Sequence, residues 1–247
     1  MRNLLASRES MRISCRAEKK REAGNCDAYI QEENGLNRYV VFGIIGIISG
    51  FIASLADVPL VKPGKPDPTL SVNGVNPWWA DVTSKRFKIS FWLSFLGQPG
   101  TYITMWLLAD LIESGSAALA LALRINTFIG CYTGLLCHVV FCLKPLLYQK
   151  LSKKMPDNEG SEVLKAIDPI IKVPSVIGFL SLWLGGTIIV VIAILTGALA
   201  VPKLCLLLNP VVSLIVLMIL KKCGVKIIGA LGVGFMLFSV LLMIAGM

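Results

Sequence analysis

The chain has 247 residues, of which 55% are hydrophobic and only 16% are charged. About a quarter of the residues in an ordinary soluble domain are charged, so this composition excludes such a fold. The net charge is +9, but the Lys and Arg residues lie between apolar segments, where they act as topology signals. We therefore expect a protein whose partner is the lipid bilayer and not a nucleic acid.

Residues 1–37 are polar and of mixed charge. A signal peptide has an apolar stretch close behind its basic start, whereas here no such stretch comes before Tyr39. We expect residues 1–37 to form a disordered, uncleaved tail, followed by one membrane domain over residues 38–247.

Apolar segments long enough to cross a membrane recur along that domain. A spanning helix needs about 20 apolar residues, because the hydrocarbon core is about 30 Å thick. The segments lack the alternation of transmembrane β-strands, and lipid offers no partner for an open backbone hydrogen bond. The expected fold class is all-α, a polytopic transmembrane helical bundle with six spans at about residues 39–60, 89–112, 117–142, 173–198, 201–220 and 225–247.

Lys and Arg residues are concentrated after the first, third and fifth spans and are absent between the second and third. Positive charge marks the cytoplasmic side, so both termini are expected outside, with the protein multi-pass in the cell (plasma or inner) membrane. The basic tail and Arg38 argue for the opposite orientation.

The connection after the third span contains its own apolar face. Val163, Leu164 and Ile167 lie on one side of a helix before Pro169 interrupts it. This pattern predicts a short helix on the membrane surface.

Ionisable side chains within the spans mark candidate sites, because each costs about 2.5–3.5 kcal/mol at membrane depth unless it finds a partner or water. Four residues of the third span fall within about 40° on a helix of 100° per residue: Arg124, Cys131, His138 and Cys142. Thr127 shares this stripe, and His138 is the chain's only histidine. The stripe should face the bundle interior, either as a ligand-binding or proton-relay wall or as a polar packing seam.

A second such face lies on the first span, where small and polar residues recur at intervals of four, four and three: Gly46, Gly50, Ser54 and Asp57. The small residues allow close helix contact. Asp57 is expected either to pair with Arg124 or His138 or to be solvated at the interface. Asp110, close to Glu113 at the end of the second span, fits a solvated helix end.

Two spans contain a proline near their middle. Gln98 precedes Pro99 in the second, and Asn209 precedes Pro210 in the fifth. Breaks at corresponding places are the pattern expected of two inverted three-helix halves around a central site, although proline is also frequent in membrane helices generally.

Neither a cofactor nor a metal is expected. Cys131, His138 and Cys142 extend over about 16 Å of helix, too far for one ion with ligand bonds of about 2 Å. Only His138 and Cys142 are close enough to share one.

The order of features resembles an uncharacterised family of six-span bacterial membrane proteins, of the domain-of-unknown-function type. Short motifs within residues 40–245 carry the resemblance: Ala56-Asp57, Arg86, Gly97, His138, Pro174-Ser175 and Leu208-Asn209-Pro210. The resemblance implies a six-span fold but no activity.

The candidate substrate-binding residues lie on spans 1, 2, 3 and 5: Asp57, Gln98, Arg124, His138 and Asn209. The leading hypothesis is a transporter-like protein for a small molecule or ion. One alternative is a membrane-embedded enzyme acting on a lipid or isoprenoid, with His138 and Asp57 as an acid/base pair, although no G-x-S-x-G nucleophile motif is present. The other is a non-catalytic sensor, immunity or assembly protein whose polar seam only packs. The oligomeric state and the identity of the ligand stay open.

Overall fold

The computed structural model describes residues 38–60, 75–155, 157–223 and 229–247. Within these residues the structure is helical and contains no strand. In chain order the helices are a first helix over Arg38–Leu60, α2 (Lys85–Glu113), α3 (Ala117–Leu151), α4 (Asp157–Lys165), α5 (Asp168–Phe179), the π-helical η3 (Leu180–Gly185), α6 (Gly186–Thr196), η4 (Lys203–Leu207), α7 (Pro210–Lys222) and α8 (Ala230–Ala245). The predicted tail over residues 1–37 lies outside the described residues.

Three of the described helices are long and apolar enough to cross a membrane: Arg38–Leu60, Ala117–Leu151 and Asp168–Thr196. The third of these is formed by α5, η3 and α6 in succession. Helix α2 has 29 residues but contains Gln98, Pro99 and several Ser and Thr residues, and it is not among the three. The apolar parts of α7 and α8 are shorter, Pro210–Leu220 and Leu231–Ala245.

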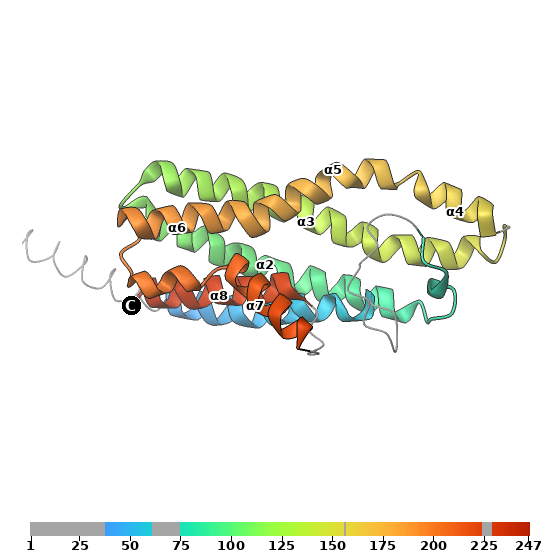
Figure 1. Cartoon of the computed structure of the whole chain (residues 1–247), viewed down its shortest axis with the longest axis horizontal. Coiled ribbons are helices and arrows are strands. Elements are labelled where there is room, and N and C mark those ends of the chain that lie inside the picture. Colours follow the sequence, from blue (N-terminus) through green and yellow to red (C-terminus); the bar gives the residue numbers. More distant parts are fainter. Residues whose placement is uncertain (1–37, 61–74, 156, 224–228) are drawn as a thin grey trace, which may run out of the picture.

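The helices form an elongated bundle (Figure 1). Helix α3 packs against α5, the first helix lies alongside α8, and α2 contacts both α3 and α8. Tyr39 packs against Gly246, so the first helix begins where α8 ends. We call this the terminal end of the bundle and the opposite one the α4 end.

The prediction of a break in the second span is wrong, because α2 runs without interruption through Pro99. Proline is tolerated in a membrane helix whose neighbours support it, and α2 is enclosed by the first helix and α3. The fifth segment does break. Helix α7 begins at Pro210, where Asn209 Oδ1 accepts a hydrogen bond from the Val212 N–H at 3.0 Å and acts as a helix cap. The paired breaks expected of inverted halves are therefore not found.

The connection after α3 differs from its prediction. Helix α3 continues to Leu151 instead of ending near residue 142, which places Lys144 inside the helix, 2% exposed. The expected short helix is present as α4, but Leu164 packs into a core cluster with Tyr148, Trp79 and Phe87. The apolar face of α4 thus contacts protein at Leu164, because the extended α3 and the short helix η2 (Pro77–Trp79) offer an apolar surface there.

Small residues bring the first helix into close contact with α2 and α8. Gly46 lies against Thr104 of α2 and Ser239 of α8, and Gly50 lies against Gly232. In return, Gly97 of α2 lies against the backbone of Ser49 and Ala53. Small residues are the usual means of close approach between membrane helices, and the small-residue face of the first helix does pack in this way.

This packing predicts that Gly97→Ala destabilises the protein. A Cβ at Gly97 would lie 2.7 Å from the Ala53 backbone nitrogen, and backbone cannot move aside as a side chain can. Overpacking of this kind lowers the free energy of unfolding by about 1–3 kcal/mol. Each kcal/mol lowers Tm by about 2–4 °C, which thermal unfolding in detergent measures. Gly186→Ala is the control, because its nearest neighbour is the flexible Met105 Cε at 3.4 Å; equal shifts for the two variants would contradict the prediction.

Candidate functional site

Polar side chains of α2 and α3 meet at three levels of their interface. We call this set the α2–α3 seam: Ser90, Ser94, Gln98, Tyr102 and Asp110 of α2, with Arg124, Thr127, Cys131, His138 and Cys142 of α3. The helices are antiparallel, so Ser90 meets His138, Tyr102 meets Cys131 and Asp110 meets Arg124. Ser90 and Asp110 lie about 30 Å apart along α2, which equals the thickness of the hydrocarbon core.

At the α4 end of the seam, the structure brings Asp57 and His138 together. His138 Nδ1 lies 3.9 Å from Asp57 Oδ1, and their side chains are 12% and 26% exposed. On the other side of the imidazole, Nε2 lies 3.1 Å from Ser90 Oγ and 3.3 Å from the Ser90 carbonyl oxygen. Of the two partners predicted for Asp57, the structure selects His138.

The hydrogen bonds of Ser90 define how His138 is protonated. The Ser90 hydroxyl donates to the Ala56 carbonyl oxygen at 2.7 Å, and Cys142 Sγ donates to Ser90 Oγ at 3.4 Å. Because the Ser90 hydroxyl hydrogen is used in the bond to the Ala56 carbonyl, Ser90 Oγ accepts a hydrogen bond from Nε2–H of His138. The unprotonated Nδ1 of the neutral imidazole then faces Asp57. The Nδ1–Asp57 pair is favourable when one of the two groups holds a further proton, so this pair can store a proton.

The middle of the seam is a set of neutral hydrogen bonds. Gln98 Nε2 donates to Ser94 Oγ at 2.8 Å, and the Tyr102 hydroxyl donates to Gln98 Oε1 at 2.5 Å. The same hydroxyl lies 3.2 Å from the Cys131 carbonyl oxygen on α3. Gln98 is therefore held within the seam by its neighbours instead of standing at a helix break.

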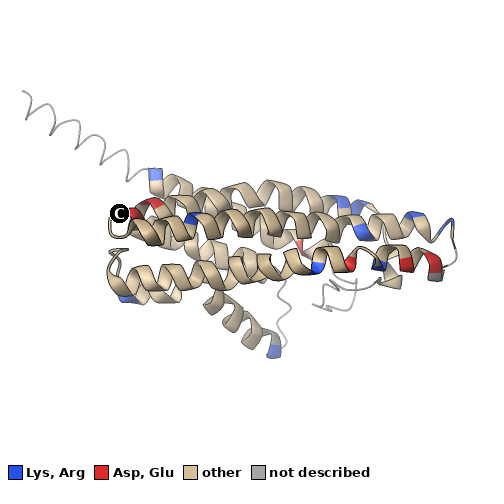
Figure 2. Cartoon of the chain, turned by 90° about the horizontal axis from the view of Figure 1, so that it is seen from above, with Lys and Arg blue, Asp and Glu red and all other residues tan. Residues whose placement is uncertain are grey.

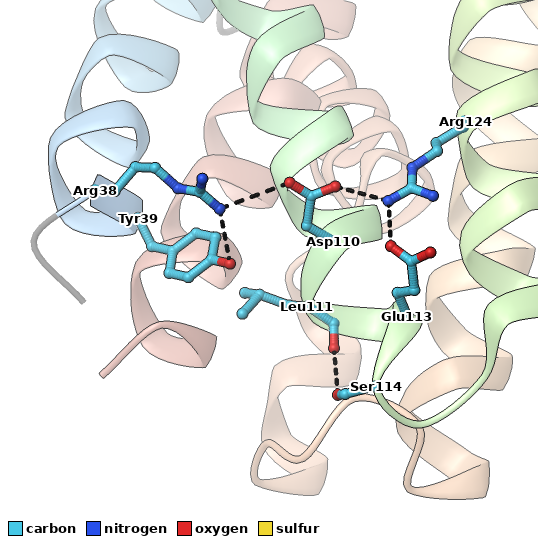
Figure 3. Close-up of polar contacts among 7 residues, drawn as sticks. All are labelled: Arg38, Tyr39, Asp110, Leu111, Glu113, Ser114 and Arg124. Carbon is cyan, nitrogen blue, oxygen red and sulfur yellow. Dashed lines mark hydrogen bonds and ion pairs between the residues drawn. The ribbon is translucent and has the colours of Figure 1, made fainter. Parts of the chain in front are cut away.

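At the terminal end, two arginines and two carboxylates form an ion-pair network (Figure 3). Arg124 contacts Asp110 at 2.8 Å and Glu113 at 2.5 Å, and Arg38 approaches Asp110 at 3.7 Å. The hydrogen bond from Arg124 lowers the pKa of Glu113 below its ordinary value. Asp110 is thus not a solvated helix end, and Arg124 pairs with Asp110 and Glu113 and not with Asp57.

The other predicted residues are not part of one cluster. Arg124 and His138 lie at opposite ends of the seam, with Gln98 between them. Asn209 is 4% exposed and caps α7, and its Nδ2 donates to the Leu206 carbonyl oxygen at 2.6 Å. Among the described residues, Asp57 and His138 are the candidates that contact each other directly.

Sequence reasoning missed Ser90 and Tyr102, which connect the candidates. A signal was present, since Ser90, Ser94 and Gln98 recur at intervals of four residues and so share one face of α2. The predicted end of the third span near residue 142 placed Lys144 in the following connection, whereas Lys144 lies within α3 and forms an ion pair with Asp168 at the start of α5. The described residues contain no group of three or more His, Cys, Asp or Glu side chains that could hold a metal ion.

Comparison with known proteins places the chain in a family without assigning an activity. Residues 30–247 match the family of unknown function DUF6796. The chain belongs to this family. The family match begins ten residues earlier than the resemblance seen in the sequence, which started near residue 40. No curated protein and no solved structure matches the chain.

The terminal network predicts an order of stabilities. Asp110→Asn should lower Tm by about 2–4 °C, the equivalent of about 1 kcal/mol in a protein of this size, because Asp110 joins both arginines and is 28% exposed. Glu113→Gln should lower it less, because Glu113 is 51% exposed and, among the described residues, its carboxylate pairs with one arginine, Arg124. Thermal unfolding of both variants in the same detergent checks this, and a larger loss for Glu113→Gln would refute it.

Proposed function

We propose that the protein is a six-pass transporter-like protein of the cell membrane, which moves protons, alone or with a small polar solute, along the α2–α3 seam. The observation that carries the proposal is the contact of Asp57 with His138 at one end of a polar interface as long as the membrane is thick. An ionisable group at membrane depth is a functional candidate by default, and here two such groups share a site.

The path of the chain supports six passes. The first helix, α2, α3 and the α5–α6 helix cross the bundle in alternating directions (Figure 1). A fifth crossing combines η4 and α7, broken at Asn209, and α8 returns to Tyr39 at the terminal end. Helix α7 alone, with 13 residues, rises about 20 Å, so the crossing needs η4 as well.

The distribution of charge supports an orientation with both termini outside. Charged residues gather mainly at the two ends of the bundle (Figure 2). Lysines dominate the α4 end and its connections: Lys85, Lys88, Lys150, Lys153, Lys154, Lys165 and Lys172. The terminal end carries fewer basic residues, Arg38, Arg124 and Lys203. Basic excess marks the cytoplasmic side, which places the α4 end there.

The chemistry of the pair favours a proton as the ion. Imidazole titrates near neutral pH, whereas the hard cations are held by several oxygen ligands. Around His138 the described residues supply one carboxylate, from Asp57, and one hydroxyl, from Ser90, and that hydroxyl is already bonded to Ala56. Such a set suits the storage and release of a proton more than the coordination of a metal cation.

For the enzyme alternative, the structure offers a suitable order of side chains but no access of a substrate to the serine. Ser90, His138 and Asp57 follow one another in the order of a nucleophile, base and acid. However, Ser90 is 0% exposed and its hydroxyl donates to Ala56. A lipid carbonyl would have to reach that buried oxygen, so the structure supports a proton relay better than an acyl-transfer nucleophile.

Water access to the middle of the seam tests the proposal. Single-cysteine variants keep either Cys131 or the exposed Cys223 and replace the other six cysteines. A small membrane-impermeant thiol reagent is applied to intact cells and to inverted vesicles. We expect Cys131 to react, because solute or proton movement requires water at that depth, and Cys223 to react in inverted vesicles alone.

Phe128→Cys in a cysteine-free background is the matched control, because Phe128 lies near the depth of Cys131 but is 69% exposed on the lipid side of α3. It should stay unreactive. If Cys131 stays unreactive in both preparations while the denatured protein reacts fully, water from outside does not reach the middle of the seam. The transport proposal would then fail in favour of a sensor or assembly protein.

A further inference from the structure

Two buried side-chain atoms of the described residues have no hydrogen-bond partner, Arg124 Nε and Thr127 Oγ1. Thr127 is 5% exposed, and neighbouring buried threonines are satisfied, since Thr101 donates to the Gln98 carbonyl and Thr104 to the Gly100 carbonyl. An unmet buried polar group costs about 1–3 kcal/mol. Native proteins nearly always supply a partner, either from the protein or from an ordered water.

The two atoms belong to side chains that one small molecule can bridge. Arg124 and Thr127 are three residues apart on α3 and share the stripe that faces α2. Cβ atoms at this spacing lie about 5–6 Å apart, and a bridging water makes a hydrogen bond of about 2.8 Å to each of its partners. Arg124 Nε–H can only donate, whereas the Thr127 hydroxyl can donate or accept, so a bridging molecule must both accept and donate.

The charge around the site favours a neutral ligand. Arg38 and Arg124 are balanced by the carboxylates of Asp110 and Glu113, so no excess positive charge is left to hold an anion. A molecule that is neutral, small, and both donor and acceptor is water. We propose that Arg124 and Thr127 bind a water molecule between α2 and α3, in the terminal half of the seam.

This water site would fill a gap in the polar contacts at the terminal half of the seam. Between the Asp110–Arg124 pair and the Tyr102–Cys131 contact, Thr127 is the seam residue of α3 that makes no hydrogen bond through its side chain. Thr127 lies about 6 Å along the helix from Cys131. A water there gives α3 a polar contact at each turn from Arg124 to Cys131. The site goes beyond the proposed function, since it exists whether or not the seam transports.

Thr127→Val tests the site, because valine has the shape of threonine without the hydroxyl. If the hydroxyl holds water that also serves Arg124, the variant should lower Tm by about 2–4 °C in detergent. If the hydroxyl has no partner at all, valine should raise Tm by removing an unmet polar group. Thr104→Val is the control, because that hydroxyl bonds the carbonyl of its own helix, and its shift should be smaller. An unchanged or raised Tm for Thr127→Val overturns the proposal.

A double-mutant cycle with Arg124→Lys tests the sharing of one water. Lysine keeps the positive charge but has no Nε–H. The change in ion-pair geometry that Arg124→Lys causes is present with and without Thr127→Val, so it cancels when the two effects of Thr127→Val are compared. We expect Thr127→Val to lower Tm less in the Lys background than in the wild type. Equal effects in the two backgrounds would overturn the shared site. Should Arg124→Lys fail to fold, the sign of the Thr127→Val shift alone decides.

These measurements require no transport and are separate from the labelling of Cys131. A dry, unreactive Cys131 together with a destabilised Thr127→Val protein would end the transport proposal and leave the water site standing. A reactive Cys131 with a stabilised Thr127→Val protein would do the reverse.

Discussion

The close packing of α2 between two partners is the constraint on which the rest of the structure depends. One face of α2 lies against the first helix, where Gly97 allows backbone to meet Ala53. Another face presents Ser90 and Tyr102 toward α3. Because the first helix is held this close, the Ala56 carbonyl reaches Ser90 and the Asp57 carboxylate reaches His138. The apolar contact therefore positions the polar site.

The two ends of the seam are built differently. At the terminal end, full charges meet in a network that is partly exposed, and Arg124 also lies over the ring of Trp106 at 5.7 Å. At the α4 end, a single carboxylate faces an imidazole, and neutral hydroxyl and thiol groups complete the set. Ion pairs suit a place where water screens them, whereas a titratable pair that can become neutral suits the interior. The network thus fits a structural clasp between α2, α3 and the first helix, and the Asp57 pair fits a site that changes its protonation.

The sequence was sufficient for the features that depend on local composition and periodicity. Apolar length predicted helices, and helical spacing placed the residues from Arg124 to Cys142 on one face of α3. That face was expected to point into the bundle, and in the structure it meets α2. It could not predict which residues on facing helices meet, because the antiparallel register of α2 and α3 depends on side-chain packing along both helices. For this reason Arg124 was one of the two partners predicted for Asp57, although the register places it beside Asp110 at the other end.

Pro99 and Pro210 show that the sequence was also insufficient to predict where the backbone of a helix is interrupted. Both follow an amide residue, so the sequence treats them alike, yet Pro99 lies inside a continuous helix and Pro210 begins one. At Pro210 the Asn209 side chain caps the new helix, while Pro210 itself packs against Gly234 of α8. At Pro99 the Gln98 side chain instead bonds Ser94 within its own helix and accepts from Tyr102. At these two prolines the preceding side chain serves in one case as a cap and in the other as part of an interhelical seam, and the tertiary contacts decide between the two.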